Sequence, residues 1–296
     1  MMMKFQISLL LPLACALLYV VAALAVKRAA ALGAGIWRTG FLSNWTVALF
    51  FLPLWWGASA AHQPSLDYWQ PAVTALLFFA GQAFTFWALS HGDVSVVTPV
   101  MGTKVILVAL FSSLLRVGVV PWQWWVGAGL STAAIMLLHR GSGANRPRVG
   151  RTVLLAFCSA TAFGLGDVLV QKWLPHWGAR QFFPPMFAGV GLLSFGFMPF
   201  FKAPLWAMNA AMWRWVSAAA FLLALNNAGV LWSIGLVGSA TAVNIVYSLR
   251  GLFSVLLVWG IGHWFMSTEQ HLEPGVLRAR LLGAGLMVAA IGLVLI

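Results

Sequence analysis

The chain contains 296 residues, of which 62% are hydrophobic and 7% are charged, and its net charge is +12. A water-soluble domain of this length needs far more charged residues to cover its surface, so the composition excludes an ordinary soluble protein. The positive charges lie mostly in short segments between apolar runs, which argues against a nucleic-acid partner and indicates a role in orienting the chain in a membrane.

The apolar runs predict an all-α integral membrane protein with ten transmembrane helices. A bilayer core of about 30 Å requires about 20 apolar residues per helix. The predicted helices cover residues 6–26, 40–58, 69–90, 94–115, 120–138, 151–173, 182–201, 212–235, 240–264 and 279–296. The first run ends in Lys27 and Arg28 rather than at a small-residue cleavage site, so we expect a spanning helix there and not a signal peptide.

An internal repeat divides the chain. The polar segment HRGSGANRPRVG (139–150) separates a first half, residues 1–138, from a second half, residues 151–296. The string GAGLSTAAIML (127–137) returns in the second half as GAGLMVAAIGL (283–293). Because five helices per half is an odd number, the second half must enter the membrane in the opposite sense. We therefore predict two inverted five-helix repeats, a plan that in transporters puts the binding site near the midplane.

The distribution of Lys and Arg predicts the orientation. Basic residues are concentrated in one alternate set of loops, which includes the 139–150 segment, and the other set is much poorer in them. The richer set contains Lys27, Arg28, Arg38, Arg140, Arg146, Arg148, Arg151, Lys202, Arg214, Arg278 and Arg280, and the poorer set contains Lys4, Arg116, Lys172 and Arg180. The positive-inside rule then predicts a cytoplasmic 139–150 segment, with both termini outside.

Two basic residues fall deep inside predicted helices. When Gly92 is aligned with Gly238, the fourth predicted helix runs beside the ninth, and Lys104 falls on Arg250. Each cation lies about ten residues into its helix, which at 1.5 Å per residue is about 15 Å deep, near the bilayer centre. Such residues usually face a bundle interior or a wet cavity, since a central charge costs roughly 2.5–3.5 kcal/mol. Two of them in equivalent helices indicate a site for negative charge.

Asp167 is the single acidic residue deep in a predicted helix. One carboxylate neutralises only one of the two cations, or is shared between them. We therefore expect Lys104, Arg250 or both to contact an anionic substrate, with a purely structural ion pair as the alternative. For Asp167 two roles stay open, an ion-pairing partner and a group that couples transport to a proton or to the substrate.

Further polar side chains fall where they can line the same cavity. Gln82 lies in the third predicted helix, and Asn226 and Asn227 lie in the matching part of the eighth. Asn244 and Tyr247 precede the arginine of the ninth helix by six and three residues, so Tyr247 shares its helical face. We expect Gln82, Asn227, Asn244 and Tyr247 to bind substrate. The alternative for the amides is hydrogen bonding between helices.

With these features, the chain resembles the drug/metabolite transporter superfamily in its ten-helix form with two EamA-like repeats. The resemblance rests on the five-plus-five layout, on the short turns SHGDVS (90–95) and LVGSAT (236–241), and on the small-residue helices five and ten. The stretch TKVILVALFSSLL (103–115) is similar to the fourth helix of nucleotide-sugar and sugar-phosphate transporters. That similarity implies a phosphate-binding role for Lys104 and, near the basic residue of the ninth helix in those families, for Arg250. Many relatives have both termini in the cytoplasm, opposite to the orientation that the charges predict.

These features favour a secondary transporter of a small organic solute, anionic or zwitterionic, that works by alternating access. An amino-acid or drug exporter of the same superfamily is one alternative. Others are a membrane-embedded enzyme acting on a lipid phosphate and a non-transporting receptor or assembly subunit. We expect no enzymatic activity, no catalytic residue, no metal and no cofactor, because the chain has no P-loop string and no clustered acids or histidines. The expected partners are the solute and membrane lipids, in a bacterial inner membrane.

Overall fold

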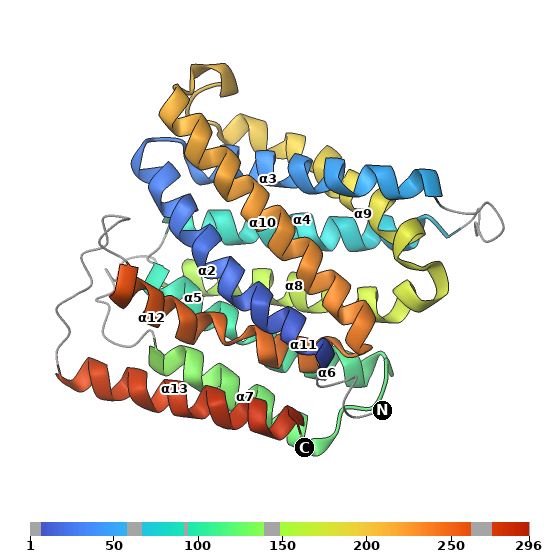
Figure 1. The fold of residues 1–296 in the computed structure, drawn as a ribbon, viewed down its shortest axis with the longest axis vertical. Coiled ribbons are helices and arrows are strands. Elements are labelled where there is room, and N and C mark those ends of the chain that lie inside the picture. Colours follow the sequence, from blue (N-terminus) through green and yellow to red (C-terminus); the bar gives the residue numbers. More distant parts are fainter. Residues whose placement is uncertain (1–6, 58–66, 92–93, 139–148, 262–273, 296) are drawn as a thin grey trace.

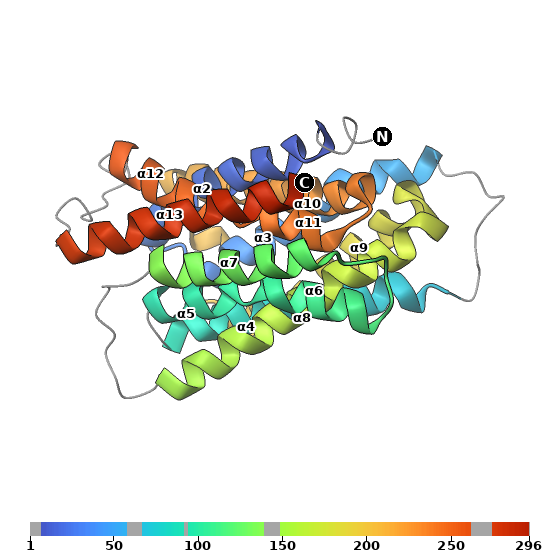
Figure 2. The same cartoon turned by 90° about the horizontal axis from the view of Figure 1, so that it is seen from below.

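The computed structural model describes residues 7–57, 67–91, 94–138, 149–261 and 274–295, and in these ranges it contains helices and no strands (Figures 1 and 2). The helices, in chain order, are α2 (Leu10–Ala31), α3 (Ile36–Phe51), η1 (Leu52–Gly57), α4 (Trp69–His91), α5 (Val94–Gly102), α6 (Lys104–Leu114), α7 (Trp122–Leu138), α8 (Val149–Trp177), α9 (Ala179–Leu193), η4 (Ser194–Phe200), η5 (Leu205–Ala207), α10 (Ala210–Val237), α11 (Ala240–Tyr247), α12 (Arg250–Ile261) and α13 (Pro274–Leu295). Residues 139–148 of the predicted connecting segment lie outside the described ranges.

Six helical segments of the described chain are long and apolar enough to cross a membrane. They are Leu10–Ala31, Trp69–His91, Val96–Leu114, Gly150–Trp177, Ala179–Phe200 and Ala210–Val237. Leu281–Leu295 is a shorter apolar helix. The all-helical class with membrane-spanning character is therefore confirmed, whereas the number of ten spans stays a prediction.

The first helix differs from its predicted bounds. We expected it to end at residue 26, before Lys27 and Arg28, but α2 continues through both residues. The helix ends where the Gly33 backbone adopts a φ of 89°, a conformation that glycine reaches without strain. Basic side chains in the last turn interact favourably with the negative end of the helix dipole, so their charge does not terminate the helix.

The fourth and ninth predicted helices are each broken near the middle. Between α5 and α6, the Thr103 N–H donates to the Val100 carbonyl at 3.1 Å, a bond to the third residue back. Between α11 and α12, the N–H of Leu249 bonds three residues back in the same way, also at 3.1 Å. Such 3₁₀ turns tighten the chain and change the direction of the side chains that follow. The residues that follow the two breaks are Lys104 and Arg250.

The repeated glycine-rich strings form one closely packed helix pair, α7 with α13, which lie side by side in both views (Figures 1 and 2). A Cβ atom added to Gly127 would lie 3.2 Å from the Ala290 carbonyl oxygen. A Cβ added to Gly283 would lie 2.9 Å from the Ala134 carbonyl oxygen. The two backbones approach this closely because glycine has no side chain at either contact.

The remaining helices pack around a central space. The helix α4 packs against α8 and α9, and α10 packs against α2 and α3. The start of α2 and the end of α13 lie at one end of the bundle, and the end of α7 and the start of α13 lie at the other (Figures 1 and 2). Aromatic rings fill much of the contact between α3, α4 and η4. Trp87, for example, lies edge-on to Trp37, with ring centroids 6.1 Å apart.

Candidate functional site

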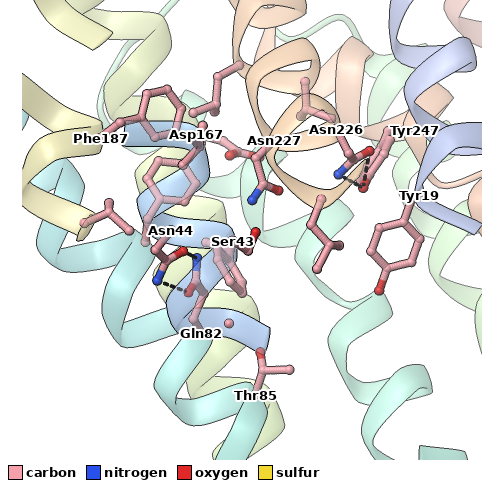
Figure 3. Close-up of a pocket in the computed structure, with 18 of the residues that line it drawn as sticks. Tyr19, Ser43, Asn44, Gln82, Thr85, Asp167, Phe187, Asn226, Asn227 and Tyr247 are labelled. Carbon is pink, nitrogen blue, oxygen red and sulfur yellow. Dashed lines mark hydrogen bonds between the residues drawn. The ribbon is translucent and has the colours of Figure 1, made fainter. Parts of the chain in front are cut away.

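A cavity of about 210 Å³ is lined by residues from both sides of the 139–150 segment (Figure 3). Its walls are mostly apolar, and its polar side chains come from eight helices, α2, α3, α4, α6, α8, α10, α11 and α12. These polar side chains are Tyr19, Ser43, Asn44, Gln82, Thr85, Lys104, Asp167, Asn226, Asn227, Tyr247 and Arg250. Five of the expected substrate-binding residues thus lie around one cavity: Gln82, Lys104, Asn227, Tyr247 and Arg250.

Lys104 and Asp167 form an ion pair, with Nζ 2.7 Å from Oδ2. The carboxylate belongs to α8 and is 1% exposed, whereas the ammonium belongs to α6 and is 15% exposed. The expected pairing of Asp167 with one of the deep cations is therefore present. The two charges neutralise each other in a region where an isolated charge is costly.

Arg250 has aromatic neighbours. Its Cζ atom lies 4.7 Å from the ring centroid of Tyr19 and 4.6 Å from that of Tyr247. A guanidinium over the face of an aromatic ring is attracted by the ring quadrupole, and the rings restrict its position. In the described ranges the acidic residues are Asp67 and Asp167, and neither forms an ion pair with Arg250.

The two neighbouring amides of α10 have different surroundings (Figure 3). Asn226 is buried, and its Nδ2 donates to the Tyr247 hydroxyl at 3.0 Å. This bond fixes the phenol against α10. Asn227 lines the cavity, and no side-chain hydrogen bond to another described residue is present. Its amide is therefore available to a bound solute.

Gln82 is engaged in a reciprocal amide pair (Figure 3). Asn44 Nδ2 donates to Gln82 Oε1 at 2.8 Å, and Gln82 Nε2 donates to Asn44 Oδ1 at 3.0 Å. The pair joins α3 to α4 at the cavity wall and satisfies one donor and one acceptor of each amide. One amide proton of each side chain is left for a further acceptor.

Asn244 lies elsewhere than expected. It is 3% exposed and does not belong to the cavity lining. Its Nδ2 donates to Asp167 Oδ2 at 2.8 Å and to the Ala240 carbonyl at 2.9 Å. The reason is the helical phase, because α11 is buried along its whole length and turns this position toward α8. The side chain supports the carboxylate of the ion pair instead of facing the cavity.

Tyr19 and Asn44 are among the cavity residues that were missed from the sequence. Tyr19 lies midway along α2, and Asn44 lies midway along α3. Asn44 carried a usable signal, since an amide inside an apolar run needs a hydrogen-bonding partner. Tyr19 carried little signal, because aromatic residues make up 14% of the chain and most of them serve to pack helices together.

A second polar feature lies at the end of the bundle where α2 starts and α13 ends (Figures 1 and 2). Gln171 of α8 donates from Nε2 to the Val117 carbonyl at 3.0 Å and to the Gly238 carbonyl at 2.9 Å. Its Oε1 accepts the Ala240 N–H at 2.8 Å. One side chain therefore connects the segment after α6 to the turn between α10 and α11. A smaller cavity of about 160 Å³ adjoins it.

Comparison with known proteins points to a transporter family. Residues 6–140 match the EamA-like transporter family. A search of curated proteins finds no match. Among the solved structures that are similar, one crystal structure has a TM-score of 0.74 and 16% sequence identity, and the alignment covers 97% of this chain and 96% of that chain. At this identity the likeness shows the fold alone. The family match covers somewhat less than half of the chain, and together with the apolar helices it supports a membrane protein whose first part is similar to that transporter family.

Proposed function

We propose that this protein is a secondary transporter that carries a small organic solute with a negatively charged group across the membrane by alternating access. The observation that carries the proposal is the cavity beside Arg250, whose guanidinium has no carboxylate partner among the described residues. A bound anion compensates such a charge. A zwitterion also needs a carboxylate for its ammonium group, and Asp167 already pairs with Lys104. The anion is therefore the favoured cargo.

Two inverted five-helix repeats, residues 1–138 and 151–296, account for the helix contacts. The repeated strings of α7 and α13 contact each other reciprocally. Gly127 meets Ala290, and the equivalent Gly283 meets Ala134. Reciprocal contacts of equivalent residues between antiparallel helices are what a two-fold axis in the membrane plane produces. In these repeats α4 is equivalent to α10, and α8 is equivalent to α2. The packing of α4 on α8 therefore has its counterpart in the packing of α10 on α2.

Alternating access requires the cavity to be closed on one side at a time. In this conformation Gln171 joins backbone groups of both repeats at the end where α2 starts. We assign it the role of a latch that closes this end. From the distribution of basic residues, the latched end faces outward and the 139–150 segment faces the cytoplasm. The membrane is then the bacterial inner membrane.

The cavity residues take different roles in this proposal. Arg250 binds the anionic group, and Tyr247 holds the guanidinium. The Asn227 amide and the remaining amide proton of Gln82 orient the rest of the solute. Lys104 contributes less to anion binding than the sequence suggested, because Asp167 neutralises it at 2.7 Å.

The rival functions differ in how well they fit. The match to a transporter family favours transport over an enzyme that acts on a lipid phosphate. Export of amino acids or drugs by the same cavity differs from the proposal only in the cargo and the direction.

The proposal is tested by a two-step measurement on the purified full-length protein. Thermal stability is first measured against a panel of monocarboxylates, dicarboxylates, sugar phosphates, nucleotide sugars and amino acids. Uptake of every stabilising solute into proteoliposomes is then compared with uptake into protein-free liposomes. We expect at least one organic anion to stabilise the protein and to be taken up.

Stabilisation by no member of the panel, or stabilisation without uptake, contradicts the proposal. The Arg250→Ala variant separates specific from unspecific effects, since it should insert and purify but lose the stabilisation. Arg214→Ala is the matched control because Arg214 is an exposed residue of α10 that is not part of the cavity lining.

A further inference from the structure

We infer that the cavity selects solutes with one net negative charge and a compact apolar body, and that Tyr19 positions Arg250 to bind the anionic group. This inference rests on the proposed function and names the substrate class of the same site. It departs from the dianionic phosphate cargo that the similarity of residues 103–115 implied. Three observations carry it: the charge balance of the lining, the geometry of the arginine, and the size and polarity of the walls.

The described lining of the cavity carries one net positive charge. Its charged residues are Lys104, Asp167 and Arg250. The first two form a contact ion pair at 2.7 Å, and Asn244 adds a hydrogen bond to the same carboxylate oxygen at 2.8 Å. The pair is thereby neutral and held in place. Arg250 supplies the remaining charge, which one anionic group balances, whereas a second anionic charge on the solute has no partner in a poorly hydrated site.

The tyrosines fix the direction from which an anion reaches the arginine. The guanidinium lies over the ring of Tyr19 and over the ring of Tyr247, at 4.7 and 4.6 Å from their centroids. The two rings are inclined at 76° to each other. Asn226 holds the second phenol at 3.0 Å. The two rings thus form a corner that holds the guanidinium, and the N–H groups that point away from this corner can bind a carboxylate in a bidentate fork.

The size and polarity of the cavity define the rest of the solute. Its volume is about 210 Å³. Pockets for drug-sized ligands span about 300–1,000 Å³, so this conformation accommodates a smaller molecule. The walls around the polar groups are apolar, and include Val47, Phe78, Phe187, Val190 and Leu231. A small monocarboxylate with a ring or short branched chain fits this lining, with the Asn227 amide as an additional hydrogen-bonding group.

Binding of three matched probes tests the charge selection. The probes are benzoate, the dianion isophthalate and the neutral benzamide, and binding to the detergent-purified full-length protein is measured by calorimetry. We expect the wild-type protein to bind benzoate at least about tenfold more tightly than either other probe. Equal binding of benzoate and isophthalate, or of benzoate and benzamide, overturns the inference, as does absence of benzoate binding.

Changing the ion pair should change the preferred charge. Asp167→Asn leaves Lys104 unpaired and raises the net charge of the lining to +2, so isophthalate should gain at least about tenfold relative to benzoate. Lys104→Met lowers the net charge to zero, and benzoate should bind at least about tenfold more weakly. If the first variant does not purify as a monodisperse protein, the second decides. Unchanged preferences in the variants that purify overturn the inference.

The role of Tyr19 has its own readout. Tyr19→Leu removes the ring and should weaken benzoate binding at least about fivefold, whereas Tyr19→Phe restores most of the lost affinity. The effect should be smaller on benzamide, because the ring acts through the arginine. A leucine variant that weakens the binding of benzoate and benzamide equally contradicts a positioning role.

Uptake of a dianion or a neutral solute from the wider panel, without benzoate binding, would refute this inference and leave transport itself standing.

Discussion

Arg250 and Lys104 occupy equivalent places but have different partners. Each begins the second segment of a broken helix, and each lies against the cavity. The ammonium of Lys104 meets the carboxylate of Asp167, whereas the guanidinium of Arg250 meets two tyrosine rings. This asymmetry concentrates the positive charge of the site on one residue.

Arg250→Lys should impair binding although the charge is kept. A lysine ammonium is a point charge that does not form the bidentate fork, and it stacks less well against aromatic rings. We expect an affinity loss of about tenfold or more for the anion that stabilises the wild-type protein most, measured by calorimetry. The control is Arg214→Lys. Equal affinities of wild-type protein and Arg250→Lys would show that charge alone is recognised.

The amide pair of Asn44 and Gln82 should behave as one unit in stability. Alanine substitution of either residue leaves the other amide without its partner at the cavity wall. In a double-mutant cycle we expect a coupling free energy of about 0.6–1.7 kcal/mol, the range of hydrogen bonds between membrane helices. Additive effects on the free energy of unfolding would mean that the two side chains do not depend on each other.

Among the residues of the site, the sequence predicted the charged ones better than the neutral ones. Lys104, Arg250 and Asp167 could be identified because a charge inside an apolar run is costly and requires a cavity or a partner. The partner of Gln82 and the Tyr19 ring over Arg250 could not be identified. Tertiary packing decides which of many amides and aromatic rings meet, and one residue type at one position does not encode that contact.

Among the elements, the pair α7 and α13 depends on glycine at defined positions. Gly283→Ala places a methyl group 2.9 Å from the Ala134 carbonyl oxygen, so the helices must separate. We expect the free energy of unfolding to fall by about 1–3 kcal/mol. The matched control is Gly285→Ala, because a Cβ at Gly285 meets nothing within 4 Å and alanine favours the helix. Thermal unfolding in detergent checks both, and equal melting temperatures would contradict this packing role.

The proposed Gln171 latch also acts between secondary-structure elements, since it joins α8 to the segments that follow α6 and α10. Gln171→Ala removes three hydrogen bonds to backbone groups. We expect this end to open more often and a cysteine introduced at Ser112, now 1% exposed, to react faster with a water-soluble thiol reagent.

The rate at which the cysteine at position 112 reacts is compared with and without Gln171→Ala, in protein that lacks Cys15 and Cys158. Gln181→Ala in α9 serves as a control outside the cavities. An unchanged rate in the Gln171 variant would refute the latch.

The apolar runs predicted the existence of the helices well, and their interruptions poorly. The run 94–115 was expected as one helix, but α5 ends at Gly102, and Pro99 removes a backbone donor one turn before the break. The runs 40–58 and 182–201 continue as the 3₁₀ segments η1 and η4, each of which contains a proline. Hydropathy indicates burial in lipid and does not predict these changes of helical pitch.

At the scale of the whole molecule, the orientation in the membrane follows from the loops. We expect the end that carries Arg151 at the start of α8 to face the cytoplasm, and the loop with Val119 to face outward. Cysteines introduced at these two exposed positions report it, because an impermeant reagent applied to intact cells should label only Val119→Cys. Labelling of Arg151→Cys instead would reverse the orientation without affecting the fold.

Uptake of the most stabilising anion of the panel into proteoliposomes shows whether Arg250 takes part in transport. Wild-type protein, Arg250→Ala, Arg214→Ala and protein-free liposomes are compared at equal protein density. We expect uptake by the wild-type protein and by Arg214→Ala, and we expect uptake by Arg250→Ala to fall to the level of protein-free liposomes. Uptake by Arg250→Ala at the wild-type rate would contradict the account, because the single unpaired cation of the described cavity lining would then have no part in transport.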